Sequence, residues 1–289
     1  MACICRYSTF FLFCLFSVLV YGSPVQGVDE RKQVTLAFLS DAPEIALIRD
    51  GLASNPGLEV NVTSVLDKSL CVRDSELVVW GSDAGSKIAS QCPNKKLVVI
   101  SSRYMVSLMK NMYSPDTWGY YMDQPVALQV KHADLNMPSI RTLGILYNKN
   151  DIELPEIKKI MATPHRMEIK MIEIQDNQVV AQVMRDLYQS VDAVLITGNK
   201  QIWSLQDFKT YLVLGMRQNK IMIGGYNYLY TNRGSISSVH TDFTALGAKI
   251  GAQIIDGSGK GFNFFEKYKI VTNELLAARY GIYIGSKKE

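Results

Sequence analysis

Apolar and polar residues follow one another in three similar units in the second half of the chain. Each unit has a short apolar run, a few small polar residues and then a segment with helical periodicity. The apolar runs are residues 142–147, 193–197 and 221–225. Continuous apolar runs that alternate with helices are typical of a parallel sheet, because helices on both faces bury each strand on both sides. The pattern predicts an α/β fold with parallel strands.

The N-terminal half has the same pattern with shorter connections. Residues 33–39, 58–62, 77–80 and 97–100 form apolar runs typical of strands, and residues 44–52 have the periodicity of a helix. Only about a dozen residues separate the second run from the third, which leaves little room for an ordinary crossover helix. We therefore expect the N-terminal half to form an α/β lobe that is trimmed relative to an ordinary one.

Small polar residues follow most of these predicted strands. In open parallel sheets, ligands bind beyond the carboxyl ends of the strands, so these residues indicate a small-molecule site. In the first half the candidates are Ser40, Asp41, Gly81, Ser82, Ser101 and Ser102. In the second half they are Asn199, Trp203, Tyr226, Asn227 and His240. The same residue types also suit turns and helix caps without any ligand.

The first 27 residues have the features of a secretory signal peptide. Arg6 precedes an apolar run over residues 10–20, and small residues after it suit cleavage following Gly22 or Gly27. The run is shorter than the roughly 20 residues that span a bilayer as a helix. Neither site is followed by Cys, so we expect a periplasmic protein without a lipid anchor; an uncleaved N-terminal anchor is the alternative.

Cysteine usage fits export. Cleavage of the signal leaves Cys71 and Cys92, an even pair in a compartment that permits disulfides. Each lies shortly before a predicted strand, so both thiols should lie at the amino end of the first sheet, opposite the ligand edge. We predict a structural disulfide between them; two unpaired thiols or a redox role are the alternatives.

Composition and motifs argue against several other functions. The net charge is +4 without a basic stripe, so nucleic acid is not an expected partner. Residues 81–85 have Asp83 where a Gly-x-Ser-x-Gly nucleophile elbow needs serine. The three histidines are too far apart for a local metal motif, and the glycine-rich residues 257–261 lack the spacing of a phosphate loop. We expect no enzyme activity, metal or cofactor.

Four blocks of sequence within residues 33–284 carry a resemblance to a known family: Asp123-Gln124-Pro125 with Leu128-Gln129, residues 137–148, residues 233–247 and residues 273–282. In these residues and in their order, the chain resembles the ABC-transporter substrate-binding family that includes tryptophan- and tyrosine-binding proteins. The resemblance implies a type I periplasmic binding fold, in which two Rossmann-like lobes joined by three crossovers close on a ligand. Mapped here, lobe 1 would hold residues 33–124 plus 243–260, and lobe 2 residues 125–242 plus 261–289.

The resemblance favours a solute-binding protein that delivers a small molecule, such as an amino acid or related metabolite, to a membrane permease. Lobe 1 would offer hydroxyl and backbone N–H groups that suit a carboxylate, and lobe 2 amide and phenol groups that suit an amine. Two alternatives stay open. One is a sensory binding protein that regulates a membrane kinase or cyclase, and the other is a secreted enzyme on the same fold.

Overall fold

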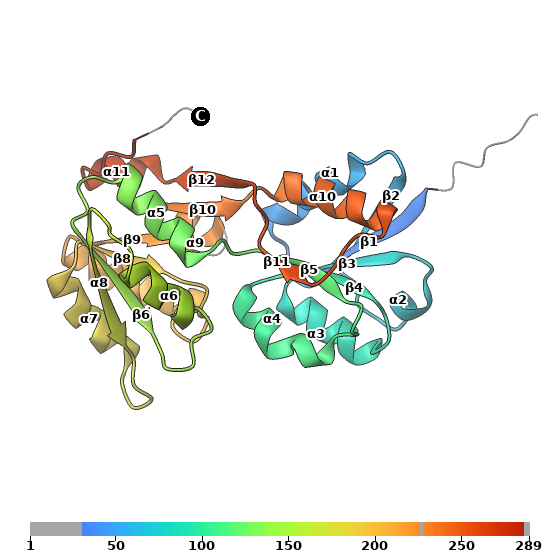
Figure 1. The fold of residues 1–289 in the computed structure, drawn as a ribbon, viewed down its shortest axis with the longest axis horizontal. Helices are drawn as coiled ribbons and strands as arrows, with labels where there is room; N and C mark the ends of the chain where they lie inside the picture. The colour runs from blue at the N-terminus through green and yellow to red at the C-terminus, as the bar shows by residue number, and fades with distance from the viewer. Residues whose placement is uncertain (1–30, 226–227, 286–289) are drawn as a thin grey trace, which may run out of the picture. The chain divides into compact units, whose positions relative to one another are not determined.

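The computed structural model describes residues 31–225 and 228–285. Two parallel sheets, each with its own helices, make up most of this part of the chain (Figure 1). We call the six-stranded sheet with its helices lobe 1 and the four-stranded sheet with its helices lobe 2. The predicted signal peptide, residues 1–27, lies outside the described residues.

Lobe 1 has the strand order β2-β1-β3-β4-β5-β11, and its neighbouring strands are parallel. The strands are β1 Lys32–Phe38, β2 Leu58–Thr63, β3 Glu76–Trp80, β4 Leu97–Ser101, β5 Trp118–Tyr121 and β11 Phe262–Asn263. The helices are α1 Pro43–Ala53, α2 Ser69–Val72, α3 Ser82–Gln91, α4 Arg103–Met109, the 3₁₀ helix Lys110–Met112, and α10 Phe243–Asp256.

Lobe 2 has the strand order β7-β6-β8-β9, also parallel. The strands are β6 Thr142–Tyr147, β7 Glu168–Glu173, β8 Ala193–Ile196 and β9 Ile221–Gly224. The helices are α5 Val126–Asn136, α6 Leu154–Met161, α7 Val180–Ser190, α8 Leu205–Arg217, α9 Tyr228–Arg233 and α11 Glu274–Arg279. Two further strands, β10 Ser237–Thr241 and β12 Tyr268–Thr272, pair antiparallel with each other.

Each sheet is buried on both faces, as its continuous apolar runs predict. In lobe 1, alternate residues of one strand enter different cores: Val78 packs with α1 and α10, whereas Leu77 and Val79 pack with α3. In lobe 2, Ile145 packs with α5 and α6, whereas Leu146 packs with α7 and α8. This arrangement exposes the ends of the strands and hides their faces.

Helix α10 returns the chain to lobe 1 by packing closely against α1, although about 200 residues separate the two (Figure 1). The close approach depends on glycine. A β-carbon built on Gly51 would lie 2.1 Å from the carbonyl oxygen of Thr244, and one on Gly247 would lie 2.3 Å from that of Ile48. Any larger residue at either position would push the two helices apart.

The chain crosses between the lobes three times, and one side chain ties the crossings together. Gln124 follows β5, Thr241 ends β10, and Phe265 follows β11. The Gln124 amide donates to Thr241 Oγ1 at 2.8 Å and to the Phe265 carbonyl at 3.1 Å, and it is buried. The three segments therefore meet at one hydrogen-bonded point.

The strands expected in residues 33–39, 58–62, 77–80, 97–100, 142–147, 193–197 and 221–225 all occur, within one or two residues at their ends. The crossover between β2 and β3 has only the four-residue helix α2. The pattern did not reveal β5 or β7. The family resemblance placed residues 261–289 in lobe 2, whereas β11, within that range, pairs with β5 in the sheet of lobe 1.

The predicted disulfide is present. Cys71 lies in α2 and Cys92 follows α3, with 5.3 Å between their α-carbons. Both residues precede a strand of the first sheet, so the bond lies at the amino end of β3 and β4. It fastens the short connection of the trimmed lobe at the edge opposite the predicted ligand site.

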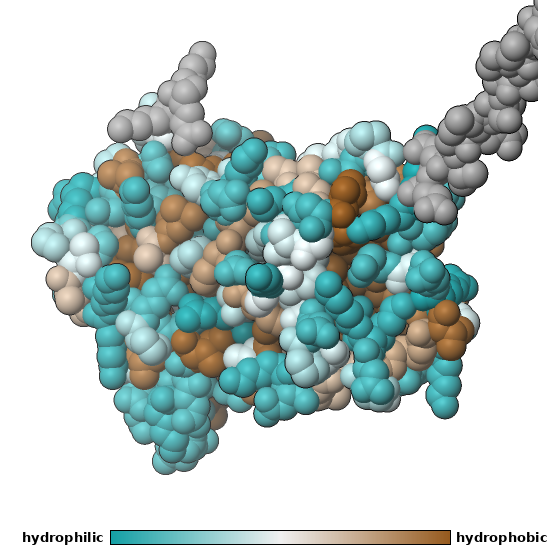
Figure 2. Space-filling view, turned by 45° about the vertical axis from the view of Figure 1, so that its right-hand side comes forward, coloured by the Kyte–Doolittle hydropathy of each residue, from teal (hydrophilic) through white to brown (hydrophobic). Residues whose placement is uncertain are grey.

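The face of the molecule drawn in Figure 2 is mostly hydrophilic. On the face drawn in Figure 2, hydrophobic residues form separate patches among hydrophilic ones. Several large apolar side chains are exposed, among them Leu275 at 87% and Val72 at 85%. Within residues 31–225 and 228–285, no helix combines the length and the apolar character that crossing a membrane requires.

Candidate functional site

Polar residues at the carboxyl ends of the strands of both sheets come together. From lobe 1, Ser82 begins α3 and Arg103 begins α4; from lobe 2, Lys200 follows β8 and Glu156 lies in α6. The Lys200 ammonium lies 3.5 Å from Ser82 Oγ, and the Arg103 guanidinium forms a 3.0 Å ion pair with Glu156. We call this region, where the strand ends of the two lobes meet, the strand-end site.

Helix α1 of lobe 1 and helix α9 of lobe 2 also come into contact. Glu44, in the first turn of α1, accepts a hydrogen bond from the backbone N–H of Tyr228 at 3.3 Å. Tyr228 begins α9, directly after the strand end at which Tyr226 and Asn227 were predicted. Those two residues lie outside the described part of the chain.

Buried carboxyl groups are the main chemical feature of the strand-end site. Among the described residues the buried acidic side chains are Glu44, Asp123, Asp151 and Glu153, and each follows the carboxyl end of a strand. None of the described lysines or arginines is buried. The interior of the site is therefore acidic, although it has Arg103 and Lys200 at its edge.

Asp123 and Glu153 face the same point. The backbone N–H of Arg103 donates to Asp123 Oδ1 at 2.7 Å, and that of Gly198 donates to Glu153 Oε2 at 3.1 Å. A β-carbon built on Gly198 would lie 2.9 Å from Glu153 Oε1 and 3.3 Å from Asp123 Oδ2. The absence of a side chain at position 198 thus leaves the two free carboxyl oxygens directed at one small space.

Burial shifts the pKa values of these groups. It raises the pKa of Asp123 from 3.8 to about 6, against the opposing effect of its hydrogen bond from Arg103. Burial, together with the charges of Asp123 and Asp151, raises the pKa of Glu153 well above its ordinary value. Loss of hydration lowers the pKa of Lys200. Asp123 and Glu153 therefore bind protons more tightly than exposed carboxyl groups do.

The predicted residues Ser82, Ser101, Ser102 and Asn199 lie at or beside this site. Ser102 Oγ caps α4 by accepting from the Met105 N–H, and the buried hydroxyl of Ser101 has no hydrogen-bond partner. The Asn199 amide donates to Asp151 Oδ2 at 2.7 Å. Ser102 and Asn199 thus have structural roles at the strand ends.

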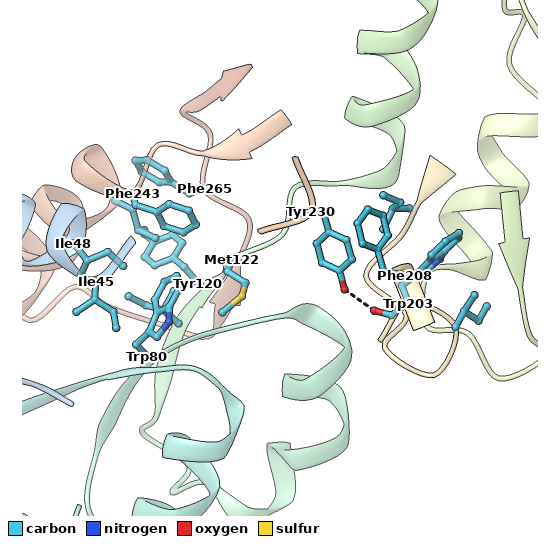
Figure 3. Close-up of a cluster of buried hydrophobic side chains, with 14 of the residues drawn as sticks. Ile45, Ile48, Trp80, Tyr120, Met122, Trp203, Phe208, Tyr230, Phe243 and Phe265 are labelled. Carbon is cyan, nitrogen blue, oxygen red and sulfur yellow. Dashed lines mark hydrogen bonds between the residues drawn. The ribbon is translucent and has the colours of Figure 1, made fainter. Parts of the chain in front are cut away.

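Trp203 and His240 are enclosed. Trp203 is fully buried in the core of lobe 2, edge-to-face with Tyr211, and its carbonyl accepts a hydrogen bond from the Tyr230 hydroxyl (Figure 3). His240 Nε2 lies 2.6 Å from Ser238 Oγ, and burial lowers its pKa to about 3. The chain turns inward after Asn199, which places Trp203 under the strand ends.

The remaining predicted residues are Ser40, Asp41 and Gly81. Ser40 and Asp41 are exposed in the turn between β1 and α1. Gly81 has a φ of +87°, with no atom within 4 Å of a β-carbon built on it. It provides the left-handed turn that directs the chain from β3 into α3.

Sequence reasoning missed the four buried acids. It considered the residues directly after each strand, whereas Asp151 and Glu153 lie several residues beyond β6, and Asp123 lies in a crossover. The available signal was an acidic residue soon after the carboxyl ends of β1, β5 and β6. No group of three or more His, Cys, Asp or Glu residues in the described ranges has the geometry to hold a metal ion.

The sequence matches no protein-family model and no protein with a curated description. Solved structures do match. An ABC domain in complex with L-Trp from Streptococcus pneumonia is 18% identical with a TM-score of 0.57, and the match covers 89% of this chain and 96% of that chain. A ligand-free, open substrate-binding protein with adhesive properties from Clostridium difficile is 11% identical with a TM-score of 0.64, covering 89% and 97%.

A third similar structure is the XylFII-LytSN complex, in a mutant form. It is 13% identical with a TM-score of 0.50, and the match covers 85% of this chain and 99% of that chain. The chain thus has the two-lobe α/β fold of ABC-transporter substrate-binding proteins, as its sequence predicts.

Proposed function

We propose that this chain is an exported solute-binding protein that captures a small molecule between its lobes and presents it to an ABC transporter. The observation that carries the proposal is the meeting of the two sets of strand ends at one polar site. Ser82 with Lys200 and Arg103 with Glu156 are the contacts that join them. In parallel α/β sheets the carboxyl ends of the strands are where ligands bind.

Capture would work by closure of the lobes around the solute. The three crossings held together by Gln124 form a compact hinge, so that one lobe can rotate against the other without disturbing either sheet. The Arg103–Glu156 ion pair joins α4 of lobe 1 to α6 of lobe 2 and would strengthen as water leaves the site. A bound ligand stabilises the closed form by contacting both lobes at once.

The partner is a membrane protein that recognises the closed form. The L-Trp complex and the Clostridium difficile protein are named as an ABC domain and a substrate-binding protein, which favours a permease. The alternative is a sensory role, since XylFII, which has a similar fold, was solved in complex with LytSN. In that case the closed form would bind the outer domain of a membrane kinase or cyclase without transport.

Thermal-shift screening of the chain without residues 1–27 tests the proposal. A ligand that binds only the folded state raises stability by RT ln(1 + [L]/Kd), about 2.7 kcal/mol at a hundredfold excess over Kd. Amino acids, amines, sugars and small carboxylic acids form the screen. A specific rise in Tm that a glycine-to-alanine change at Gly198 removes supports the proposed site. If no compound in the screen raises Tm, solute binding by this chain is refuted.

A further inference from the structure

A small cavity lies at the strand-end site. Asp123, Glu153, Thr197 and Gly198 line it, and apolar residues of β8 and α5, Gly225 and two glutamines complete its wall. The glutamines are Gln124 and Gln129, and their amide N–H groups already donate to Thr241, Phe265, Gly225 and Val239. The volume of the cavity is about 10 Å³, which is room for about one water-sized group. An ammonium group is close to a water molecule in size, so the cavity fits the charged end of an amine without its carbon chain.

Two oxygens on this cavity are buried and have no hydrogen-bond partner. They are Asp123 Oδ2 and Thr197 Oγ1, on residues that are both at least nine-tenths buried. Glu153 Oε1 faces the same space, as the position of a β-carbon on Gly198 shows. Because buried polar atoms in proteins are nearly always hydrogen-bonded, these acceptors indicate a bound donor.

The charges around the cavity indicate that this donor is positive. The groups that face Asp123 and Glu153 from the surrounding elements are Arg103 from α4, Glu156 from α6, Asp151 and Tyr121 from the strand ends, and Lys200 after β8. Arg103 is already paired with Glu156, and the Lys200 ammonium contacts Ser82. The carboxyl pair thus has no direct cationic partner in the described part of the chain.

The donor set suits an ammonium group better than a metal ion. Calcium and magnesium require six or more oxygen ligands, and the described residues contain no metal-binding group of acids and histidines. An ammonium instead has three N–H donors in a compact charge. Three acceptors, from Asp123, Glu153 and Thr197, face the cavity.

We propose that Asp123, Glu153 and Thr197 receive the ammonium group of the bound solute, so that the physiological ligand is a primary amine or an amino acid. The inference rests on the proposed solute-binding function and narrows its ligand class. The ammonium takes the position in which the free carboxyl pair holds a proton. Binding therefore releases a proton to solvent, and affinity falls as the pH decreases and both carboxyl groups become protonated.

Matched ligands test the inference. Each proteinogenic L-amino acid is compared with the 2-hydroxy acid that has a hydroxyl in place of the ammonium, and linear diamines and neutral sugars complete the set. We expect amines to raise Tm and their hydroxy analogues to have no effect. Isothermal titration of the best amine, in buffers of different ionisation enthalpy, should report proton release near pH 6.

Variants of the chain separate the site from the fold. Asp123→Asn and Glu153→Gln each remove one charged acceptor and should weaken binding of the best amine about 10- to 100-fold. Gly198→Ala fills the space between the carboxyl groups and should abolish it. Asp176→Asn is the matched control, because that side chain is 84% exposed, pairs with Lys149 and does not line this cavity. It should bind as the wild type does.

The outcomes distinguish the inference from the function on which it rests. Binding of a sugar or a hydroxy acid as tightly as any amine would overturn the ammonium site and leave solute binding intact. Amine binding that is unchanged in both Asp123→Asn and Glu153→Gln would overturn it as well. If no compound binds, both the ammonium site and the proposed function fail.

Discussion

Replacing Asp123 by asparagine should make the ligand-free protein more stable at neutral pH. The carboxyl group is 3% exposed, and only one of its oxygens has a hydrogen-bond partner, the Arg103 N–H at 2.7 Å. Asparagine has nearly the same shape and keeps an oxygen for Arg103. It carries no charge, so the variant no longer holds an ionised carboxylate away from water.

The size of the effect follows from the pKa. Burial raises the pKa of Asp123 from 3.8 to about 6, so the folded chain binds this proton more tightly than the unfolded chain. Folding stability therefore decreases as the pH rises between these two values and is lowest above pH 6. The raised pKa of Asp123 lowers the free energy of unfolding by about 3 kcal/mol above pH 6 and has almost no effect on it below pH 4. Asp123→Asn should recover most of it at pH 7.5.

Urea unfolding, followed by tryptophan fluorescence at pH 4, 5 and 7.5, measures this gain. Titrating groups away from Asp123, including the buried histidines, contribute equally to both proteins and cancel in the comparison. Glu153 does not cancel, because the charge of Asp123 raises its pKa, and the loss of that charge adds to the gain in the variant. Asp176→Asn repeats the same chemical change at an exposed position and should leave the profile unchanged. Equal stability of Asp123→Asn and wild type at pH 7.5, or a gain of the same size at every pH, would refute the reasoning.

Three further results are expected. Replacing both Cys71 and Cys92 by serine opens a cross-link with a sequence separation of 21 residues and should lower the free energy of unfolding by about 3 kcal/mol, measured in denaturant; an unchanged midpoint would contradict this. Gly51→Ala should destabilise lobe 1 by more than about 3 kcal/mol, because its β-carbon would meet the Thr244 carbonyl. A β-carbon on the exposed Gly257 would meet no atom within 4 Å, so Gly257→Ala should destabilise the protein less. Burial lowers the pKa of His240 from 6.5 to about 3, so the stability that depends on the neutral imidazole is complete above pH 6.5 and is lost as the pH falls toward 3. His240→Gln should therefore flatten that part of the acid-unfolding curve.

Much of the fold could be predicted because strands and helices are marked by local patterns. Apolar runs such as residues 142–147 are strands in the structure, and Ser82 begins a helix where the polar strand end suggested one. The strand β7 was missed because its sequence alternates charged and apolar residues at an edge of the sheet. The strand β11 was missed because two residues are too few to form a pattern, and only its pairing with β5 makes it a strand.

The site was harder to predict than the fold. Serine and asparagine were predicted as site residues because they directly follow strands in the sequence. Trp203 fits the same pattern, yet the chain turns it into the core of lobe 2. Whether a residue near a strand end faces the ligand or the core depends on the path of the loop after it, which a local pattern does not contain.

The sequence by itself determined the α/β class, the positions of most strands along the chain, the short second connection and the pairing of Cys71 with Cys92. These features depend on residues that are close together in the chain. Only the tertiary structure decided the charge of the site, since Asp123, Glu153 and Thr197 come from three separate connections. Their pKa values and their shared cavity arise from desolvation, which exists only after both lobes have folded around them.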